Sequence, residues 1–130
     1  MKATGKAVSP TGDTTTQAPA VAEATLAINT RPLFKLMVEK KASDLFFTSN
    51  APIKIKIEGQ IFPVNKQILT PETVRQSAFA LMTPEQLEYF HRELEIDFAI
   101  SEPGLGRFRV NVFHQRGFPA LVMRYITADM

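Results

Sequence analysis

The amino-acid sequence predicts a mixed α+β domain, an antiparallel sheet of five or six strands with helices packed on one face. Three observations predict this class. Segments of helical periodicity follow clear helix-start signals, and segments with alternating apolar and polar residues lie on both sides of them. Short turns rich in glycine join neighbouring alternating segments, as in hairpins. The length of 130 residues suits one domain preceded by a tail.

The first 29 residues are predicted to form a disordered tail. Residues 1–30 contain seven Ala, seven Thr and no aromatic residue, whereas all ten Phe lie between Phe34 and Phe118. A segment so poor in large apolar groups cannot offset the entropy lost on ordering. Only the short apolar stretch 26–28 is expected to dock locally. The folded domain is therefore predicted over residues 30–126.

The first half of this domain is predicted to contain one helix and three strands. Asn29 or Thr30 can cap a helix that carries Pro32 in its first turn. Three strand segments follow, separated by turn residues: 44–48, 53–57 and 60–64. Pro63 has no N–H to donate, so its end of the last strand is expected at an edge of the sheet.

The second half is predicted to contain two capped helices and three strands. Thr70 precedes Pro71, and Thr83 is followed three residues later by Gln86, which is the pattern of a capping box. The strand segments are 93–100, 107–115 and 120–126. In the first of them every second residue is apolar: Leu94, Ile96, Phe98 and Ile100.

The composition excludes several classes of function. The chain has no cysteine, which excludes disulfides, cysteine-ligated metal centres and thiol catalysis. The 15 basic and 13 acidic residues give a net charge of +2, too small to indicate nucleic acid or an anionic membrane as a partner. No run of about 18 apolar residues is present, so no transmembrane segment is predicted.

Side chains suited to catalysis are few. His91 and His114 fall on different predicted elements without the spacing of metal ligands, and surface histidines are the simpler interpretation. Glu95 and Asp97 share one strand face about 7 Å apart, a separation that could serve acid–base chemistry. Pairing of these acids with basic residues on the next strand, Arg107 and Arg109, is favoured over that role.

Arg124 is the most unusual candidate. It lies 15 residues after Arg109, on the strand predicted to be adjacent. Its own strand has apolar residues at both parities, which is typical of a strand covered on both faces. A guanidinium there must pair or meet a group from outside the chain, and this group is suited to holding a phosphate bidentately. A salt bridge to Asp97 or Glu95 remains the alternative.

Several motifs resemble the start of the type IV pilus retraction ATPases, the PilT and PilU family. The likeness covers about residues 31–130 and is carried by three runs: Leu33-Phe34-Lys35-Leu36-Met37-Val38-Glu39-Lys40 with Ala42-Ser43-Asp44-Leu45, Gly106-Arg107-Phe108-Arg109-Val110-Asn111, and Val122-Met123-Arg124-Tyr125-Ile126. Phe46 and Lys56 stand where the PilU branch differs from the main motor. Lys41 departs from the pattern, because a glycine often ends the first helix there.

The resemblance implies a PAS-like sheet domain over residues 30–126, with 127–130 beginning a linker to a RecA-like ATPase domain. It also implies a cytoplasmic homo-hexameric motor of the secretion ATPase superfamily, peripheral at the inner-membrane pilus base, which powers pilus retraction and twitching motility. The implied partners are neighbouring subunits, a paralogous retraction motor and the inner-membrane pilus platform, but not nucleic acid.

In that family, paired arginines of the N-terminal domain reach the phosphates of ATP. By motif they fall on Arg109 and Arg124, with Arg107 and Arg116 as weaker candidates. ATP and Mg²⁺ would be held mainly by the RecA-like domain, because residues 1–130 contain no G-x-x-x-x-G-K-[ST] loop. This chain alone is therefore expected not to hydrolyse ATP.

Two other functions are weighed beside this one. A stand-alone PAS-like sensor or protein-interaction domain would use the sheet face to bind a small molecule or a protein. A weak nucleic-acid binder would use the basic residues of two strand segments: Lys54, Lys56, Arg107 and Arg109.

Overall fold

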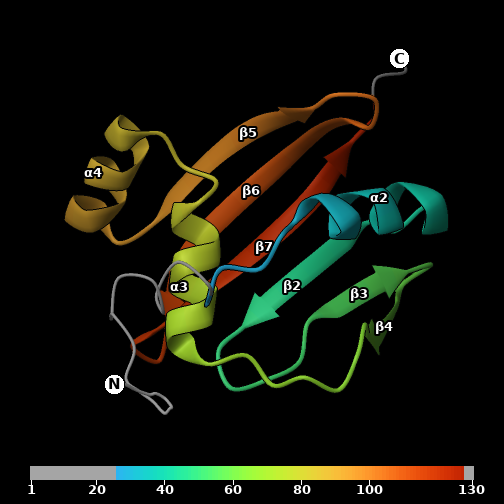
Figure 1. Ribbon diagram of the computed structural model, residues 1–130, viewed down its shortest axis with the longest axis horizontal. Coiled ribbons are helices and arrows are strands. Elements are labelled where there is room, and N and C mark those ends of the chain that lie inside the picture. Colours follow the sequence, from blue (N-terminus) through green and yellow to red (C-terminus); the bar gives the residue numbers. More distant parts are fainter. Residues whose placement is uncertain (1–25, 128–130) are drawn as a thin grey trace, which may run out of the picture.

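A computed structural model describes residues 26–127, of which 31–126 form three helices and six strands (Figure 1). In chain order they are α2 (Arg31–Lys40), β2 (Asp44–Thr48), β3 (Lys54–Ile57), β4 (Gln60–Pro63), α3 (Pro71–Phe79), α4 (Pro84–Glu93), β5 (Ile96–Glu102), β6 (Gly106–Gln115) and β7 (Phe118–Ile126). The predicted tail lies outside the described residues up to position 25, as do residues 128–130.

The six strands form a single antiparallel sheet in the order β4-β3-β2-β7-β6-β5. The α+β class and the five or six strands predicted from sequence are confirmed. The last strand in the chain, β7, lies in the middle of the sheet between β2 and β6. It therefore joins strands β2 to β4 on one side to strands β5 and β6 on the other.

The hydrophobic core lies between one face of the sheet and the helices. Figure 1 shows α2 and α3 crossing this face. Phe34 and Met37 of α2 and Val74 of α3 are fully buried, together with Phe108 from the sheet. The rings of Phe34 and Phe108 lie 4.3 Å apart between centroids, a distance typical of packed aromatic pairs.

The starts of α3 and α4 form as the sequence predicts. The Thr70 side chain accepts a hydrogen bond from the Thr73 backbone N–H at 3.1 Å. At α4, Thr83 Oγ1 accepts from the Gln86 backbone N–H at 3.2 Å, and Gln86 Oε1 accepts from the Thr83 N–H at 3.0 Å. These bonds satisfy N–H groups that have no partner within the helix.

The ends of α2 and α4 use residues other than glycine in the left-handed region. Lys41 ends α2 with φ 55°. This residue therefore adopts the left-handed conformation that a helix-ending glycine usually adopts, although it is a lysine. Leu94 ends α4 with φ 65° and is 56% exposed. The predicted strand 93–100 is therefore wrong at its start, because Glu93 belongs to α4 and β5 begins at Ile96.

The docking expected for residues 26–28 is confirmed at Ile28. Its backbone N–H donates to Ser77 Oγ on α3 at 2.9 Å, and its side chain packs against the core. Among the helices of residues 26–127, none combines the length and apolar character that crossing a membrane requires.

Candidate functional site

The face of the sheet opposite α2 and α3, here called the open face, carries a row of charged side chains. Strand register places Lys56, Asp44, Arg124 and Arg109 directly opposite one another along neighbouring strands, in that order. Directly opposite residues of antiparallel strands project from the same face with Cβ atoms about 5 Å apart. The row therefore brings three cations and one buried acid together on adjacent strands.

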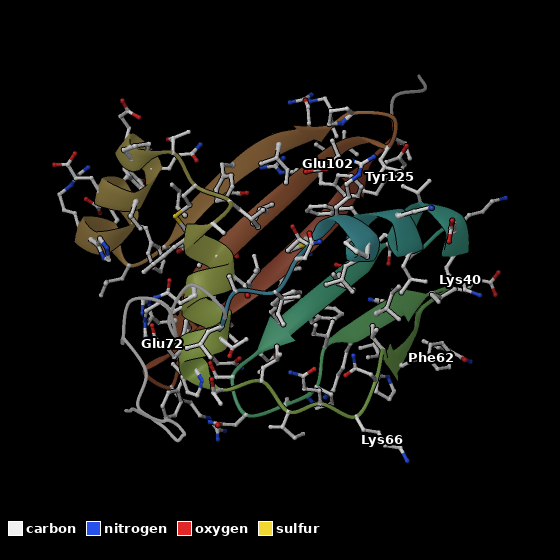
Figure 2. All side chains as sticks on the ribbon, in the orientation of Figure 1. Lys40, Phe62, Lys66, Glu72, Glu102 and Tyr125 are labelled. Atoms are coloured by element: carbon white, nitrogen blue, oxygen red, sulfur yellow. The ribbon has the colours of Figure 1, made fainter. Side chains whose placement is uncertain are left out.

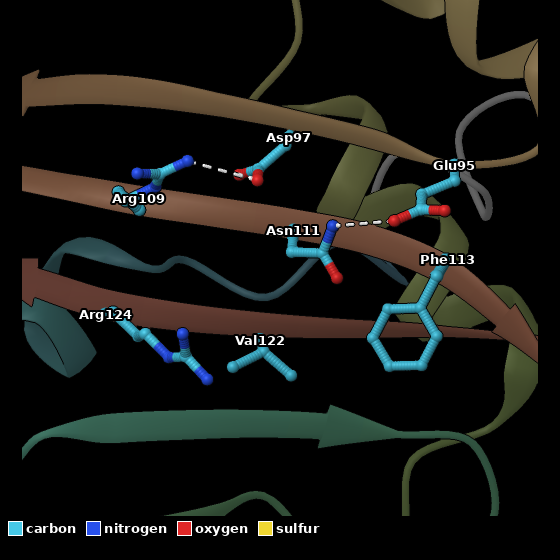
Figure 3. Close-up of a pocket in the computed structure, with 7 residues that line it drawn as sticks. All are labelled: Glu95, Asp97, Arg109, Asn111, Phe113, Val122 and Arg124. Atoms are coloured by element: carbon cyan, nitrogen blue, oxygen red, sulfur yellow. Dashed lines mark hydrogen bonds and ion pairs between the residues drawn. The ribbon is translucent and has the colours of Figure 1, made fainter.

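Arg109 and Arg124, here called the arginine pair, are its centre. Two like charges placed directly opposite each other normally destabilise a sheet. Their side chains are 60% and 68% exposed, so solvent screens this repulsion. Figure 3 shows that the two guanidinium groups do not point at one another, and that Arg109 turns toward β5. Each is held by a carboxylate on the strand beyond.

Arg124 is held by Asp44 of β2. Arg124 Nε donates to Asp44 Oδ2 at 2.9 Å, and the Asp44 side chain is only 12% exposed. Burial of the Asp44 carboxyl raises its pKa, but hydrogen bonds from Ser43 and Arg124 and the charges of Arg124 and Lys56 outweigh burial and hold the pKa below its ordinary value. Asp44 is therefore a buried, ionised anchor for Arg124.

Arg109 is held by Asp97 of β5. The prediction that Glu95 and Asp97 pair with basic residues of the next strand is thus confirmed for Asp97. Arg109 Nη2 donates to Asp97 Oδ2 at 3.1 Å, and the Asp97 side chain is 52% exposed. Exposed pairs of this kind contribute about 0–1 kcal/mol, because solvent screens them and ordering the side chains costs entropy. This ion pair can therefore open at little cost.

A shallow depression of about 600 Å³ lies over the arginine pair (Figure 3). Its size suits a small ligand, and its walls combine guanidinium, carboxylate, amide and apolar groups. The lining residues are Glu95, Asp97, Arg109, Asn111, Phe113, Val122 and Arg124. The Asn111 amide donates to the Ile96 carbonyl at 3.3 Å and to Glu95 at 3.5 Å, distances at the weak end for hydrogen bonds.

The prediction that β7 is covered on both faces is wrong for its C-terminal half. Arg124 is exposed, and Val122 on the same face is only half-buried. The partner of Arg124 also differs from the alternative given by sequence, because it is Asp44 and neither Asp97 nor Glu95. Asp44 lies 80 residues earlier in the chain, and only the pairing of β2 with β7 brings it there.

The two weaker arginine candidates lie in different places. Arg107 precedes Arg109 by two residues on β6, so it shares the open face about 7 Å away, and within residues 26–127 it makes no ion pair. Arg116 lies in the turn between β6 and β7 with φ 55°. It lies seven positions after Arg109, which is more than about 20 Å along an extended chain. The structure does not bring Arg116 to the pair.

The two histidines meet around Phe90 of α4. The His114 ring stacks on Phe90 with centroids 5.4 Å apart, and His91 lies 5.4 Å from Phe79. His114 Nδ1 also lies 3.2 Å from the Leu94 carbonyl oxygen. The His114 contacts pack the end of α4 against β6, and the His91 contact packs α4 against α3. The two histidines lie on different elements, as the sequence predicts.

Comparison with known proteins gives homologues over the folded part of the chain. PilU of Pseudomonas aeruginosa, a type IV pilus ATPase, is 42% identical over 98 residues, which are 75% of this chain and 26% of PilU. The retraction ATPase PilT of the same organism is 32% identical over 98 residues, 75% of this chain and 28% of PilT. The chain thus spans about a quarter of the length of these relatives.

A solved structure agrees with this relationship. The crystal structure of the pilus retraction motor PilT with bound ADP superposes with a TM-score of 0.72 at 28% identity, over 79% of this chain and 30% of that one. No protein-family model matches the chain. The fold and the sequence comparison point to the same relatives, and the matched part corresponds to their N-terminal domain.

Proposed function

We propose that this chain, an N-terminal domain of the PilT and PilU family of type IV pilus retraction ATPases, acts as the nucleotide-sensing part of a motor. In this proposal the arginine pair contacts the phosphates of ATP when the open face meets an ATPase domain. Such a contact would stabilise charge that develops on the phosphates during hydrolysis. The domain would close the nucleotide site and would not carry out the reaction by itself.

One observation carries the proposal. Arg109 and Arg124 occupy directly opposite positions on adjacent strands, on an exposed surface with a depression above them. Paired guanidiniums with free N–H groups match the charge and geometry of a phosphate chain. One solved relative, the pilus retraction motor PilT, carries bound ADP, which supports a nucleotide as the ligand of the assembled protein.

The residues present fit a phosphate and not a metal ion. Among residues 26–127 no three His, Cys, Asp or Glu side chains gather in a way that could hold a cation. The arginine pair would bind phosphate oxygens directly. Mg²⁺ and the remaining contacts to ATP would come from a RecA-like domain, for which residues 127–130 are proposed to begin the linker.

The wider setting follows from the same family. We propose a cytoplasmic homo-hexameric ring at the inner-membrane pilus base, in which the chain contacts a neighbouring subunit. A paralogous retraction motor and the pilus platform of the inner membrane are further proposed partners. Pilus retraction and twitching motility would be the outcome.

Alanine substitutions in the chain joined to its downstream ATPase domain test the proposal. Arg109→Ala and Arg124→Ala are each expected to lower ATP hydrolysis by at least about tenfold, while the ring remains assembled by light scattering. Arg116→Ala is the matched control, since it removes the same charge at the far end of β6. Normal turnover in both test variants would reject the roles proposed for the arginine pair.

A protein-interaction domain is the second candidate, favoured by one observation. The edge strand β4 exposes two apolar side chains, Ile61 at 54% and Phe62 at 43% (Phe62 is labelled in Figure 2), and Ile68 in the following loop is 57% exposed. Exposed apolar groups at a sheet edge are typical of contact surfaces. Polar substitution of Phe62 would impair activity of the assembled protein under this candidate, and leave it unchanged if the arginine pair alone matters.

A further inference from the structure

We infer that the two carboxylates beside the arginine pair act in opposite directions on phosphate binding: Asp44 positions Arg124 for the ligand, and Asp97 competes with the ligand for Arg109. This inference rests on the proposed function, because it assigns roles around the same site. It predicts that removing one acid weakens binding of a condensed phosphate and that removing the other strengthens it.

The contact to Asp44 leaves the phosphate-binding end of Arg124 free. Asp44 accepts a hydrogen bond from Nε, the inner nitrogen of the guanidinium, at 2.9 Å. Among the described residues Nη1 and Nη2 of Arg124 make no hydrogen bond, and they are the two groups that can hold a phosphate bidentately. Fixing Nε therefore restricts the orientation of Arg124 without using the atoms that a ligand needs.

The burial of Asp44 makes this contact lasting. The carboxylate is largely shielded from water, and its strand pairs with β3 on one side and β7 on the other. Lys56 lies directly opposite it on β3, so a cation flanks the acid on each side. A carboxylate held in this way stays ionised and cannot swing away when an anion approaches Arg124.

The contact to Asp97 has the reverse character. Asp97 accepts a hydrogen bond from Nη2 of Arg109, one of the atoms that a phosphate would take. Both side chains are more than half exposed, and both line the depression. A phosphate chain that enters the depression would therefore meet the Asp97 carboxylate as a competing anion, and it would displace that carboxylate from Arg109.

The two arginines would then differ in how they respond to the ligand. Arg124 would keep its partner, whereas Arg109 would exchange Asp97 for phosphate oxygens. The ligand would also relieve the unfavourable opposition of two cations, because an anion between them is attracted to both. Because Asp97 competes for Arg109, only a strongly charged anion would displace it and bind.

NMR titration of the 130-residue chain with inorganic tripolyphosphate tests the inference. Backbone amides of β6 and β7 report binding, and the arginine Nε–H signals report the two ion pairs. Asp97→Asn is expected to lower the apparent Kd about two- to fivefold, the range that corresponds to an exposed ion pair. Asp44→Asn is expected to raise it about tenfold, because a charged hydrogen bond that orients Arg124 is lost.

Glu102→Gln is the matched control. Glu102 pairs with Arg31 at 2.8 Å, as Asp97 pairs with Arg109, but it lies five residues further along β5 and so projects from the opposite face (Figure 2). This variant makes the same change in net charge outside the depression. The tripolyphosphate Kd of Glu102→Gln is expected to stay within about 1.5-fold of the parent value. Solvent and salt screen the charge at position 102, which lies five residues along β5 from Asp97.

A measurement on the unsubstituted chain keeps the test valid if Asp44→Asn fails to fold. The hydrogen bond to Asp44 should slow the exchange of the Arg124 Nε–H proton with water. This slow exchange is expected to persist when tripolyphosphate is added, while the Arg109 side-chain signals shift. Loss of the Arg124 signal on binding would contradict the positioning role of Asp44.

The outcomes separate the inference from the proposed function. Binding that Arg109→Ala and Arg124→Ala abolish, but that Asp97→Asn and Glu102→Gln change equally, would overturn the inference and leave the arginine pair as the phosphate site. Tighter binding in both Asp44→Asn and Asp97→Asn would also overturn it, because both acids would then merely compete. An unchanged tripolyphosphate Kd in both Arg109→Ala and Arg124→Ala would reject the proposed function itself.

Discussion

Ile28 and Ser77 lie 49 residues apart in the chain and are joined by a 2.9 Å hydrogen bond from the Ile28 backbone N–H to the Ser77 hydroxyl. The same hydroxyl donates to the Thr73 carbonyl at 2.7 Å, and Ser77 is fully buried. One hydroxyl group therefore both accepts and donates inside the protein, and it holds the segment before α2 against α3.

Ser77→Ala is expected to destabilise the domain by about 1–2 kcal/mol, because the Ile28 N–H loses its buried acceptor. Urea unfolding followed by circular dichroism measures the change, and hydrogen exchange at Ile28 should accelerate with it. Ser101→Ala, at an exposed position of β5, is the control and should change stability by less than about 0.5 kcal/mol. Unchanged exchange at Ile28 would show that the hydroxyl is not its anchor.

Gly106→Ala is expected to cost more stability than Gly59→Ala. Both glycines have positive φ, 124° and 80°, so each substitution forces alanine into a conformation that L residues rarely adopt. A Cβ at position 106 would in addition lie 3.0 Å from the Tyr125 ring, whereas one at position 59 meets nothing within 4 Å. Thermal unfolding of the two variants measures the difference, and equal losses would contradict the Tyr125 contact.

The stability contributed by Asp44 should depend on pH in one direction. Its pKa is lower in the folded chain than its ordinary value, so the unfolded chain binds this proton first as the pH falls. The contribution is therefore complete above the ordinary aspartate value of about 4 and is lost as the pH falls through the folded value. Asp44→Asn should be less stable than the parent by about 1–3 kcal/mol at pH 7.

Unfolding free energies of the parent and Asp44→Asn at a series of pH values check this prediction. The gap between the two proteins should narrow steadily in acid, because the parent then carries a protonated Asp44 as well. A gap that stays constant or widens below the ordinary aspartate value would contradict it.

Arg107 of β6 and Arg116 of the turn after it should differ in their effect on phosphate binding according to their position. Arg116→Ala is expected to leave the tripolyphosphate Kd of the chain unchanged, because the hairpin turn places Arg116 more than about 20 Å from Arg109. Arg107→Ala should weaken binding about twofold through loss of a nearby charge. The same titration measures both, and a loss with Arg116→Ala equal to that with Arg107→Ala would indicate a purely long-range effect of net charge.

Local signals account for what the sequence could predict. Thr70-Pro71 and Thr83-Pro84 start helices with hydrogen bonds that involve residues three apart, so a short window contains the whole interaction. The strand at 44–48 was also predicted with its observed bounds. Where the deciding contact is local, pattern and propensity are sufficient.

The start of β5 could not be predicted because two patterns overlap there. Leu94 continues the alternation of Ile96 and Phe98, yet its backbone ends α4 with the N–H bonded to the Phe90 carbonyl at 2.7 Å. Alternation records only which residues are apolar. It does not record that the preceding helix has not yet ended.

The candidate site was predicted in part for a similar reason. The adjacency of Arg109 and Arg124 follows from a single hairpin, and the pairing of Asp97 with Arg109 follows from the next one. The anchor Asp44 depends on the order of strands from opposite halves of the chain. No spacing in the sequence contains that information, so the true partner of Arg124 was missed.

The central place of β7 has a consequence for biosynthesis. Until Ile126 has left the ribosome, the nascent chain can form only a three-stranded meander from β2 to β4 and a separate hairpin from β5 and β6, each with an unprotected edge. β7 pairs with β2 and with β6, so the sheet should be completed in a single cooperative step once β7 is available.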